Sequence, residues 1–347
     1  MPLTSNGQDG LKANPQGQAA LPYVTSPPLD GAGRTAEEGM LIVDRSGAVA
    51  LLTPQVDASW RAPHHRRSIP LNQRFAQMWQ LPGRMVSRIM AENDLRHGIE
   101  KQQLAVFFQP QANLATGEID GVEALVRWRH PERGLVLPDD FIPLAEQTGL
   151  ICPLGEWVLR AACKQNAEWI QAGLKPVRMA VNLSARQLEQ AHLADVVEGV
   201  LTETGLDSDL LELEITESTT MRDPAKSIKA LHELRDLGLR ISMDDFGTGY
   251  SSLAHLKDLP LDTLKIDRSL ISGVTKSRSD AAIAAAIVAM AEGIHLEVVA
   301  EGVETPDQLA FVKEIRCDRY QGFLLGQPEP ASQLSSVLEH AVTERAA

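Results

Sequence analysis

The sequence predicts a TIM-like (β/α)8 barrel with one antiparallel strand, preceded by a short N-terminal segment of different character. Three observations indicate this fold class. From Met90 onward, short β-rich runs alternate with amphipathic stretches of helical length, which is typical of a parallel sheet. Eight such runs occur, and a barrel of this kind takes about 250 residues. The first two runs have no helix between them, so we expect one antiparallel strand. An open doubly wound sheet is the alternative.

The N-terminal segment divides into two parts. Residues 1–38 are rich in Gly, Pro, Ser, Gln and Asn without periodicity, which indicates a disordered tail. Residues 39–88 start with apolar runs on both sides of residues 44–47 (Asp-Arg-Ser-Gly), which predicts a hairpin. An expected helix over 72–79 with the pattern Asn-x-x-Phe-x-x-x-Trp follows, so this part resembles a fragment of a PAS sensory domain. It is too short for a complete one, which favours a remnant or a dimerisation element.

The elements of the barrel are read from the same alternation. Helical stretches between the strands include 185–204 and 224–237. The expected strands are 105–110, 119–128, 177–183, 211–216, 239–245, 263–267, 296–302 and 319–325.

Each expected strand has an apolar face and a polar face, because side chains alternate along a strand. Glu123 lies opposite Val122 and Ala124, and Lys265 lies opposite its apolar neighbours. The polar residues come late in their strands, at the rim where barrel active sites are built. A second set of acids follows the first at a spacing of one or three residues, which would place them on the opposite strand face. These acids reach the rim only if each strand has already turned into a loop. That set is Glu217, Asp245 and Glu304.

The acidic residues predict a metal centre. Seven carboxylates with one amide, one Lys and one Arg cannot all be charged without compensation, and an all-oxygen ligand set favours Mg²⁺ or Mn²⁺. Adjacent Asp244 and Asp245 suit two ions ~4 Å apart, the arrangement used for in-line phosphoryl displacement. The alternative is a set of rim salt bridges or helix N-caps, which is strongest for Glu217. The set comprises Glu123, Glu214, Glu217, Asp244, Asp245, Glu301, Glu304, Asn182, Lys265 and Arg127.

Two further features adjoin this centre. The Gly-rich loop 246–252 follows Asp244 and Asp245 directly and could meet phosphate through backbone N–H groups, or simply be a flexible helix entry. Lys265 faces inward among acids, either as an interior salt bridge or as a group that holds or activates the attacking water.

Composition excludes several classes of protein. The 347-residue chain has a formal net charge of −13 and only 4% aromatic residues, so polymeric nucleic acid is not an expected partner. Cys152, Cys163 and Cys317 lack disulfide or zinc spacing and are expected to be free thiols. No apolar run reaches the ~20 residues of a membrane span, and no secretory signal is visible. We therefore expect a cytoplasmic protein without a membrane partner.

Eight short motifs occur in order along the chain. They are QP (109–110), EALVR (123–127), NLSARQ (182–187), EITES (214–218), DDFGTGYSSL (244–253), KIDRS (265–269), AEGVE (300–304) and QGFLLGQP (321–328). These motifs resemble those of the EAL domain family, and we assign residues 92–342 to an EAL phosphodiesterase domain. The resemblance implies hydrolysis of the second messenger cyclic di-GMP to linear 5′-pGpG. No GGDEF-like segment is present, so synthesis of cyclic di-GMP is not expected.

The resemblance also implies a role for each site residue. Two ions, Mg²⁺ or Mn²⁺, would be held by Glu123, Asn182, Glu214, Asp244 and Asp245. Glu301 would lie close to the attacking water, and Lys265 would touch that water and assist its deprotonation. Glu217 would brace the Gly-rich loop, and a homodimer would form through this loop and its following helix. The substrate would be bound by Gln109, Leu125, Arg127, Glu304 and Gln321.

Two other functions remain open from the sequence. The barrel could be a non-catalytic cyclic di-GMP receptor that acts through a protein partner, although the intact acidic set favours the enzyme. It could also be an acid-rich barrel that uses enolate chemistry, which would leave Asn182 and the Gly-rich loop without a role.

Overall fold

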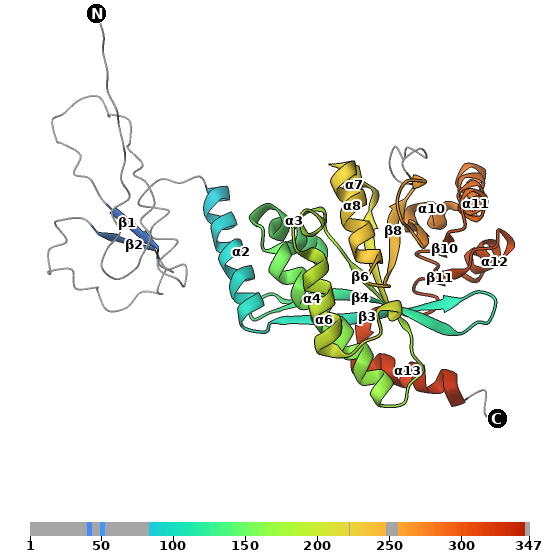
Figure 1. The fold of residues 1–347 in the computed structure, drawn as a ribbon, viewed down its shortest axis with the longest axis horizontal. Helices are drawn as coiled ribbons and strands as arrows, with labels where there is room; N and C mark the ends of the chain where they lie inside the picture. The colour runs from blue at the N-terminus through green and yellow to red at the C-terminus, as the bar shows by residue number, and fades with distance from the viewer. Residues whose placement is uncertain (1–39, 44–48, 53–82, 222, 248–255, 344–347) are drawn as a thin grey trace, which may run out of the picture. The chain divides into compact units, whose positions relative to one another are not determined.

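The chain consists of two compact units, Met1–Asp94 and Leu95–Ala347, which are considered separately. In the first unit, β1 (Met40–Val43) pairs antiparallel with β2 (Val49–Leu52), as the predicted hairpin requires. The predicted tail and the helix expected over 72–79 lie outside the described residues, so the PAS-like fragment stays a prediction. The computed structural model describes residues 40–43, 49–52, 83–221, 223–247 and 256–343 (Figure 1).

The second unit is built on a closed barrel, as predicted. Its strands follow the order β3-β11-β10-β9-β8-β7-β6-β4, and β4 pairs back onto β3 to close the ring. The open-sheet alternative is therefore wrong. The eight strands are β3 (Leu104–Asn113), β4 (Ile119–His130), β6 (Arg178–Asn182), β7 (Leu211–Thr216), β8 (Arg240–Phe246), β9 (Thr263–Ile266), β10 (Glu297–Ala300) and β11 (Arg319–Gln321).

The predicted antiparallel strand is β3. It runs antiparallel to both of its barrel neighbours, β4 and β11, whereas the other neighbouring pairs are parallel. A short connection between β3 and β4 allows only an antiparallel hairpin, because a parallel pair needs a crossover of a dozen or more residues. Two short strands extend the barrel edges: β5 (Gly134–Val136) pairs with β4, and β12 (Glu329–Pro330) pairs with β3.

Helices surround the barrel (Figure 1). The stretch 185–204, expected as one helical stretch, is divided between α5 and α6, because the capping box of Ser184 and Gln187 starts a first short helix and His192 has a non-helical backbone. The described helices are α2 (Gly83–Glu100), α3 (Pro138–Thr148), α4 (Ile151–Gln171), α5 (Ala185–Leu188), α6 (Leu193–Thr204), η1 (Ser208–Leu210), α7 (Glu217–Met221), α8 (Pro224–Arg235), α10 (Arg268–Gly273), α11 (Arg278–Gly293), α12 (Pro306–Glu314) and α13 (Ala331–Thr343).

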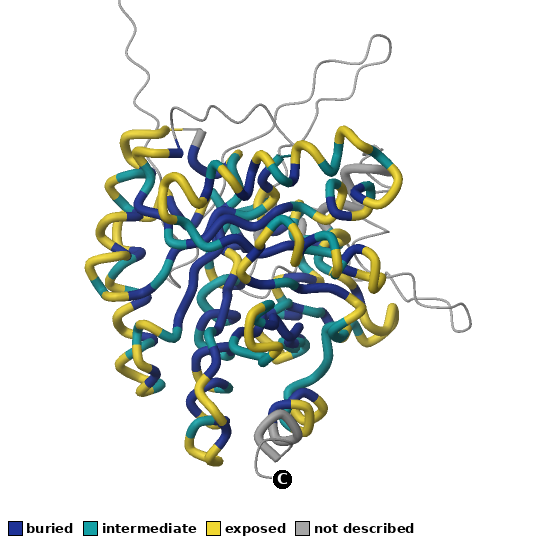
Figure 2. Tube along the Cα trace, turned by 90° about the vertical axis from the view of Figure 1, so that its right-hand side faces the viewer, coloured by how far each residue is buried: buried dark blue, intermediate teal, exposed yellow. Residues whose placement is uncertain are grey.

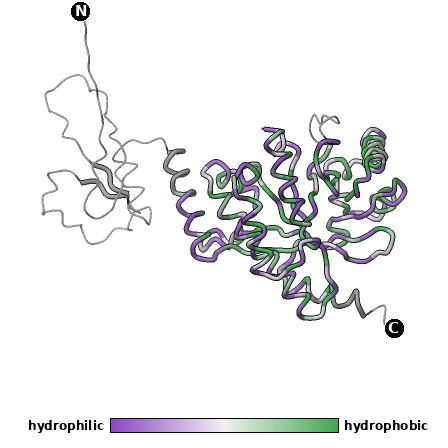
Figure 3. The backbone as a smooth tube through the Cα atoms, in the orientation of Figure 1, coloured by the Kyte–Doolittle hydropathy of each residue, from purple (hydrophilic) through white to green (hydrophobic). Residues whose placement is uncertain are grey.

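The apolar faces of the strands form the core together with the inner faces of the helices. Val122, Met179 and Leu213 are fully or almost fully buried, and Phe108 packs edge-on against Trp169 of α4 at 5.0 Å between ring centroids. Figure 2 shows the central strands mostly buried and the outer helical turns exposed. Hydrophobic and hydrophilic residues alternate along the helices in Figure 3, as expected for elements that bury one side. Among the described residues, no helix has both the length and the apolar character needed to span a bilayer.

Candidate active site

Polar side chains from six barrel strands meet at the C-terminal ends of the parallel strands. Glu123 comes from β4, Asn182 ends β6, and register pairs Asn182 with Glu214 of β7. Asp244 lies in β8, Lys265 in β9, and Glu301 directly follows β10. We call Glu123, Glu214, Asp244, Asp245 and Glu301 the acidic cluster.

Lys265 lies at the centre of the acidic cluster and is 1% exposed. Its Nζ is 2.7 Å from Glu301 Oε1 and 2.8 Å from Glu214 Oε2. It is 3.4 Å from Asp244 Oδ1 and 3.7 Å from Glu123 Oε2. The residues that sequence alternation placed on the inner face therefore do converge, and they come from strands up to 178 positions apart in the chain, from Glu123 to Glu301.

Amide side chains orient the carboxylate of Glu123. Asn182 Nδ2 donates to Glu123 Oε1 at 2.8 Å, and Gln321 Nε2 donates to Glu123 Oε2 at 2.6 Å. Gln321 Nε2 also donates to Gln109 Oε1 at 2.9 Å, while Gln111 Nε2 donates to Gln321 Oε1 at 2.8 Å. The antiparallel register sets Gln109 of β3 directly opposite Glu123 of β4, and Gln111 of β3 directly opposite Gln321 of β11, which brings the members of this network together.

A backbone irregularity brings Asp245 to the same rim as Asp244. Adjacent strand residues point to opposite faces, but Asp245 has a left-handed backbone with φ 58° and the β8–β9 register shifts between Met243 and Phe246. The N–H of Asp245 donates to Asp244 Oδ1 at 2.9 Å. As a result, carboxylate oxygens of Asp244, Asp245 and Glu301 all lie within 4.8 Å of one another. The odd spacing predicted that Asp245 reaches the rim only from a loop, but Asp245 still lies within β8, and an irregularity inside the strand brings it there instead.

The charges of the acidic cluster are poorly balanced. Burial, followed by the nearby carboxylates, raises the pKa of Glu214 well above its usual range, and burial raises the pKa of Glu301 to about 8. The surrounding carboxylates outweigh burial and raise the pKa of Lys265 well above its ordinary value. Lys265 and the amides outweigh burial at Glu123 and lower its pKa. One ammonium group therefore cannot keep every member of the cluster in its charged form.

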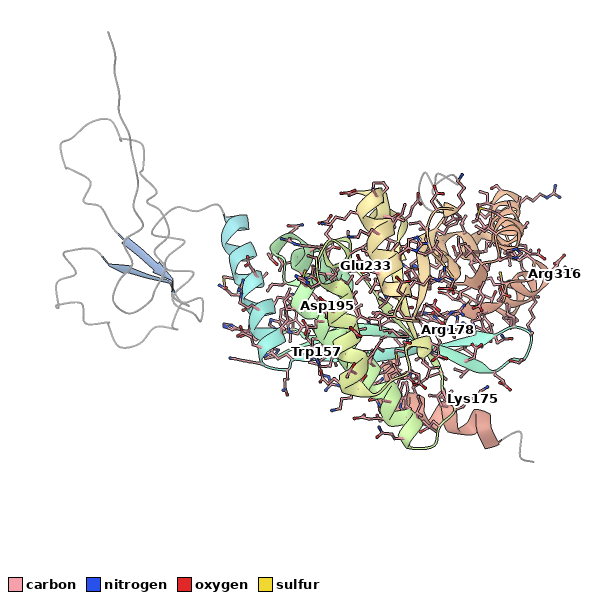
Figure 4. All side chains as sticks on the ribbon, viewed as in Figure 1. Trp157, Lys175, Arg178, Asp195, Glu233 and Arg316 are labelled. Atoms are coloured by element: carbon pink, nitrogen blue, oxygen red, sulfur yellow. The ribbon has the colours of Figure 1, made fainter. Side chains whose placement is uncertain are left out.

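The other end of the same barrel provides a contrast. Arg178, labelled in Figure 4, is 2.9 Å from Glu297 and 3.1 Å from Glu212. Arg240 lies 3.1 Å from Glu297, and Arg319 lies 3.0 Å from Asp120. Here three guanidinium groups face three carboxylates, so the layer is neutral without an added ion. We call these six residues the lower charged layer.

The residues present fit divalent cations at the acidic cluster. Glu214 Oε1 is buried and has no hydrogen-bond partner, although a buried carboxylate oxygen normally has one. The donors are carboxylate and amide oxygens, which suit Mg²⁺ or Mn²⁺. Unlike the lower charged layer, this end has an excess of carboxylates that a bound cation would offset.

The predicted substrate residues come from β3, β4, β11 and the segment after β10. Leu125 and Arg127 share the strand face of Glu123 on β4, and the Arg127 guanidinium lies 5.6 Å from the centre of the Phe107 ring. Gly302, with φ 66°, turns the chain between Glu301 and Glu304. The exposed Glu304 donates its N–H to Gln308 Oε1 at 2.8 Å. Gln109 and Gln321 are buried and join Glu123 in the amide network described above.

The structure describes Glu217 but only the start of the Gly-rich loop that it is predicted to brace. Glu217 begins α7, as an N-terminal acid of a helix would, and it takes part in further interactions. Residues 248–252 of the Gly-rich loop lie outside the described residues, so the bracing role of Glu217 stays a prediction. Cys152, Cys163 and Cys317 are free thiols, as expected.

Two sets of site residues were missed by the sequence interpretation. Gln111 is 3% exposed and shares the inward parity of Gln109, so alternation along β3 could have found it. The lower charged layer could have been found from Arg178, Arg240 and Arg319, which begin β6, β8 and β11.

Comparison with known proteins extends these observations. Residues 92–328 match the EAL domain family. The chain is 48% identical over 259 residues to "Cyclic di-GMP phosphodiesterase NbdA" of Pseudomonas aeruginosa, covering 75% of this chain and 33% of that protein. It is 49% identical over 242 residues to "Bifunctional diguanylate cyclase/cyclic di-GMP phosphodiesterase MucR" of the same organism, covering 70% of this chain and 35% of that protein. The chain thus spans about a third of the length of these relatives.

Solved structures show the same barrel. The phosphodiesterase PaMucR in complex with c-di-GMP has a TM-score of 0.68 at 48% identity and covers 71% of this chain and 99% of that chain. The EAL enzyme Bd1971, in its cAMP- and cyclic-di-GMP-bound form, has a TM-score of 0.71 at 30% identity and covers 77% of this chain and 72% of that chain.

Proposed function

Because the chain belongs to the EAL domain family, we propose that its barrel hydrolyses cyclic di-GMP to linear 5′-pGpG by attack of water on one phosphodiester bond. The observation that carries this proposal is the gathering of four carboxylates around one buried lysine, Lys265, at the C-terminal rim. They belong to Glu123, Glu214, Asp244 and Glu301. The relative NbdA is named a cyclic di-GMP phosphodiesterase, and the structure of the phosphodiesterase PaMucR was solved in complex with c-di-GMP.

We propose two divalent cations, Mg²⁺ or Mn²⁺, held by Glu123, Asn182, Glu214, Asp244 and Asp245. When bound, such ions lower the pKa of water and stabilise the charge that develops on the phosphate during an in-line displacement. The orphan oxygen of Glu214 and the shared rim position of Asp244 and Asp245 support two neighbouring sites.

Glu301 and Lys265 are the proposed catalytic pair. The buried Glu301 carboxylate lies 2.7 Å from Lys265 Nζ, so both groups are placed to meet the same attacking water. Lys265 donates to Glu301 and Glu214 and so fixes both carboxylates. The surrounding carboxylates keep the proton on Lys265. Bound cations would offset their negative charge and so lower the pKa of Lys265, which would help it to take a proton from water.

The substrate residues divide by chemistry. Arg127 is the proposed partner of a phosphate, because guanidinium groups bind phosphate oxygens in pairs. Glu304 and Gln321 are proposed to meet guanine or its neighbouring ribose phosphate, and Gln109 and Leu125 to line the site. Gln321 also fixes Glu123 at 2.6 Å, which links substrate contact to the metal ligands.

Other expectations from the sequence stay predictions. They are the homodimer, the cytoplasmic location, and the bracing role of Glu217.

Product analysis tests the proposed function. Purified full chain is incubated with cyclic di-GMP and Mg²⁺, and the reaction is followed by chromatography against a 5′-pGpG standard. Formation of 5′-pGpG that stops on chelation is expected. Binding of cyclic di-GMP without turnover would instead make the receptor alternative correct. Turnover of carboxylic acids from a substrate panel would favour enolate chemistry.

A further inference from the structure

Asn182 is exposed, whereas the proposed metal ligands Glu123 and Glu214 are buried. One side-chain hydrogen bond, to Glu123, orients the Asn182 amide. It is the last residue of β6, so the segment directly after it contributes to holding its backbone in place. That backbone is fixed at Leu183, whose N–H donates to Glu214 O at 2.8 Å, and at Ser184, which caps α5.

Gln187 holds Ser184 in place. Its Oε1 accepts from Ser184 Oγ at 2.8 Å and from Ser184 N–H at 3.2 Å, and its own N–H donates to Ser184 Oγ at 3.3 Å. Helix α5 has only 4 residues, too few to be stable without such contacts. The side chain of Gln187 is 6% exposed, so it acts from inside the protein rather than from the surface.

Gly155 of α4 makes room for this side chain. A β-carbon at position 155 would overlap the Gln187 amide. Glycine within a helix costs roughly 1 kcal/mol relative to alanine, so its presence in α4 needs a compensating reason. A cavity of about 230 Å³ opens beside the contact, lined by Cys152, Gly155, Gln187 and Leu193 among others. Packing on that side is therefore incomplete, and the hydrogen bonds of Gln187 matter more.

We propose that Gln187 and Gly155 are a positioning pair for the metal centre: Gly155 admits the Gln187 side chain, which fixes Ser184 and thereby aims the Asn182 amide oxygen at the acidic cluster. This inference rests on the proposed function, because it takes Asn182 to be a metal ligand. Neither Gln187 nor Gly155 is among the proposed ligands of metal or substrate.

Mn²⁺ affinity of the full chain tests the pair without relying on turnover. The concentration of free Mn²⁺ is followed by electron paramagnetic resonance during titration of metal-free protein. Gly155→Ala and Gln187→Ala are each expected to weaken Mn²⁺ binding about threefold to tenfold, less than the 10- to 100-fold typical of direct partners of metal ligands. Thermal melting verifies that each variant is folded.

Three matched variants sharpen the test. Gly199→Ala in α6 gains the same helix propensity in open space and is expected to bind Mn²⁺ like the unaltered chain. Gln187→Glu keeps the acceptor oxygen for Ser184 and is expected to restore binding. In the double variant, Gly155→Ala adds nothing to Gln187→Ala, because the side chain that it displaces is gone.

Two outcomes overturn the inference, and they differ. Unchanged Mn²⁺ affinity in both folded Gly155→Ala and Gln187→Ala would remove the positioning role and leave the proposed function intact. Absence of Mn²⁺ binding by the unaltered chain would overturn the proposed metal centre together with this inference.

Discussion

The ammonium nitrogen of Lys265 lies 2.7 Å from the Glu301 carboxylate, yet this lysine must also serve three other carboxylates within 4 Å. Among the ion pairs that join described residues, no second cation reaches these acids. The lower charged layer of the same barrel is balanced by arginine instead. One end of the barrel is therefore charge-balanced by its own side chains, whereas at the other end four carboxylates share one ammonium group.

Glu214 and Glu212 lie two residues apart on one face of β7 and test this asymmetry. In chelator, Glu214→Gln is expected to raise the free energy of unfolding, because burial disfavours the ionised form of Glu214 in the folded protein. Glu212→Gln is expected to lower the free energy of unfolding by roughly 3 kcal/mol, because it weakens the pairing of buried Glu212 with the partly buried Arg178. Chemical denaturation with and without Mg²⁺ measures both effects. The charge asymmetry between the two ends of the barrel is contradicted if both variants shift the free energy of unfolding in the same direction.

Loss of Lys265 separates metal binding from turnover. Lys265→Met removes a cation that competes for the same carboxylates, so Mn²⁺ is expected to bind about tenfold more tightly. Turnover is expected to fall at least ~100-fold, because a group placed to move or hold a proton is lost. Lys257→Met, at an exposed position, is the control. Weaker Mn²⁺ binding in Lys265→Met would show that the lysine supports the metal site rather than substituting for it.

The metal-free protein is expected to lose stability as pH rises. The pKa of Glu301 is about 8 in the folded protein and 4.5 in the unfolded chain, so folding favours the protonated acid. Its contribution is complete below pH 4.5 and is lost as pH rises through 8. Glu214 shifts in the same direction, whereas the lowered pKa of Glu123 acts only below 4.5.

Melting temperatures in chelator and in Mg²⁺ from pH 5 to pH 9 measure this effect. The stabilisation by Mg²⁺ is expected to grow with pH, because the ion binds the deprotonated acids. A stabilisation that is equal at pH 5 and at pH 9 would contradict the pKa of Glu301 and the placement of the metal.

Asp245 is expected to determine the number of bound ions. Asp245→Asn keeps a residue type that tolerates the left-handed backbone at φ 58° but removes the charge. Isothermal titration with Mn²⁺ should therefore show a fall from two ions to one, with little change in melting temperature in chelator. Two ions retained in Asp245→Asn would mean that Asp245 is not a ligand.

The sequence predicted much of the barrel because its signals are local. Alternation along each strand placed Glu123, Glu214 and Lys265 on the inner face, and the missing helix between the first two strands predicted the antiparallel β3. Short strands were harder: the run 319–325 yields only Arg319–Gln321 as β11, since the chain turns away at Gly322.

Other parts of the site depend on geometry that no local pattern specifies. The bulge at Asp245 sets its carboxylate beside Asp244, and spacing alone placed it on the opposite face. The pairing of Gln111 with Gln321 depends on how β3 and β11 meet, 210 positions apart in the chain. The role of Gly155 depends on the approach of α5 to α4, which the sequence of either helix does not reveal.

Anomalous scattering from crystals soaked in Mn²⁺ tests the central claim most directly, because it locates the ions rather than their effects. Two peaks are expected at the C-terminal rim of the barrel, bounded by the oxygens of Glu123, Asn182, Glu214, Asp244 and Asp245. An empty rim in fully soaked crystals, or Mn²⁺ bound only at other surfaces, would contradict the account.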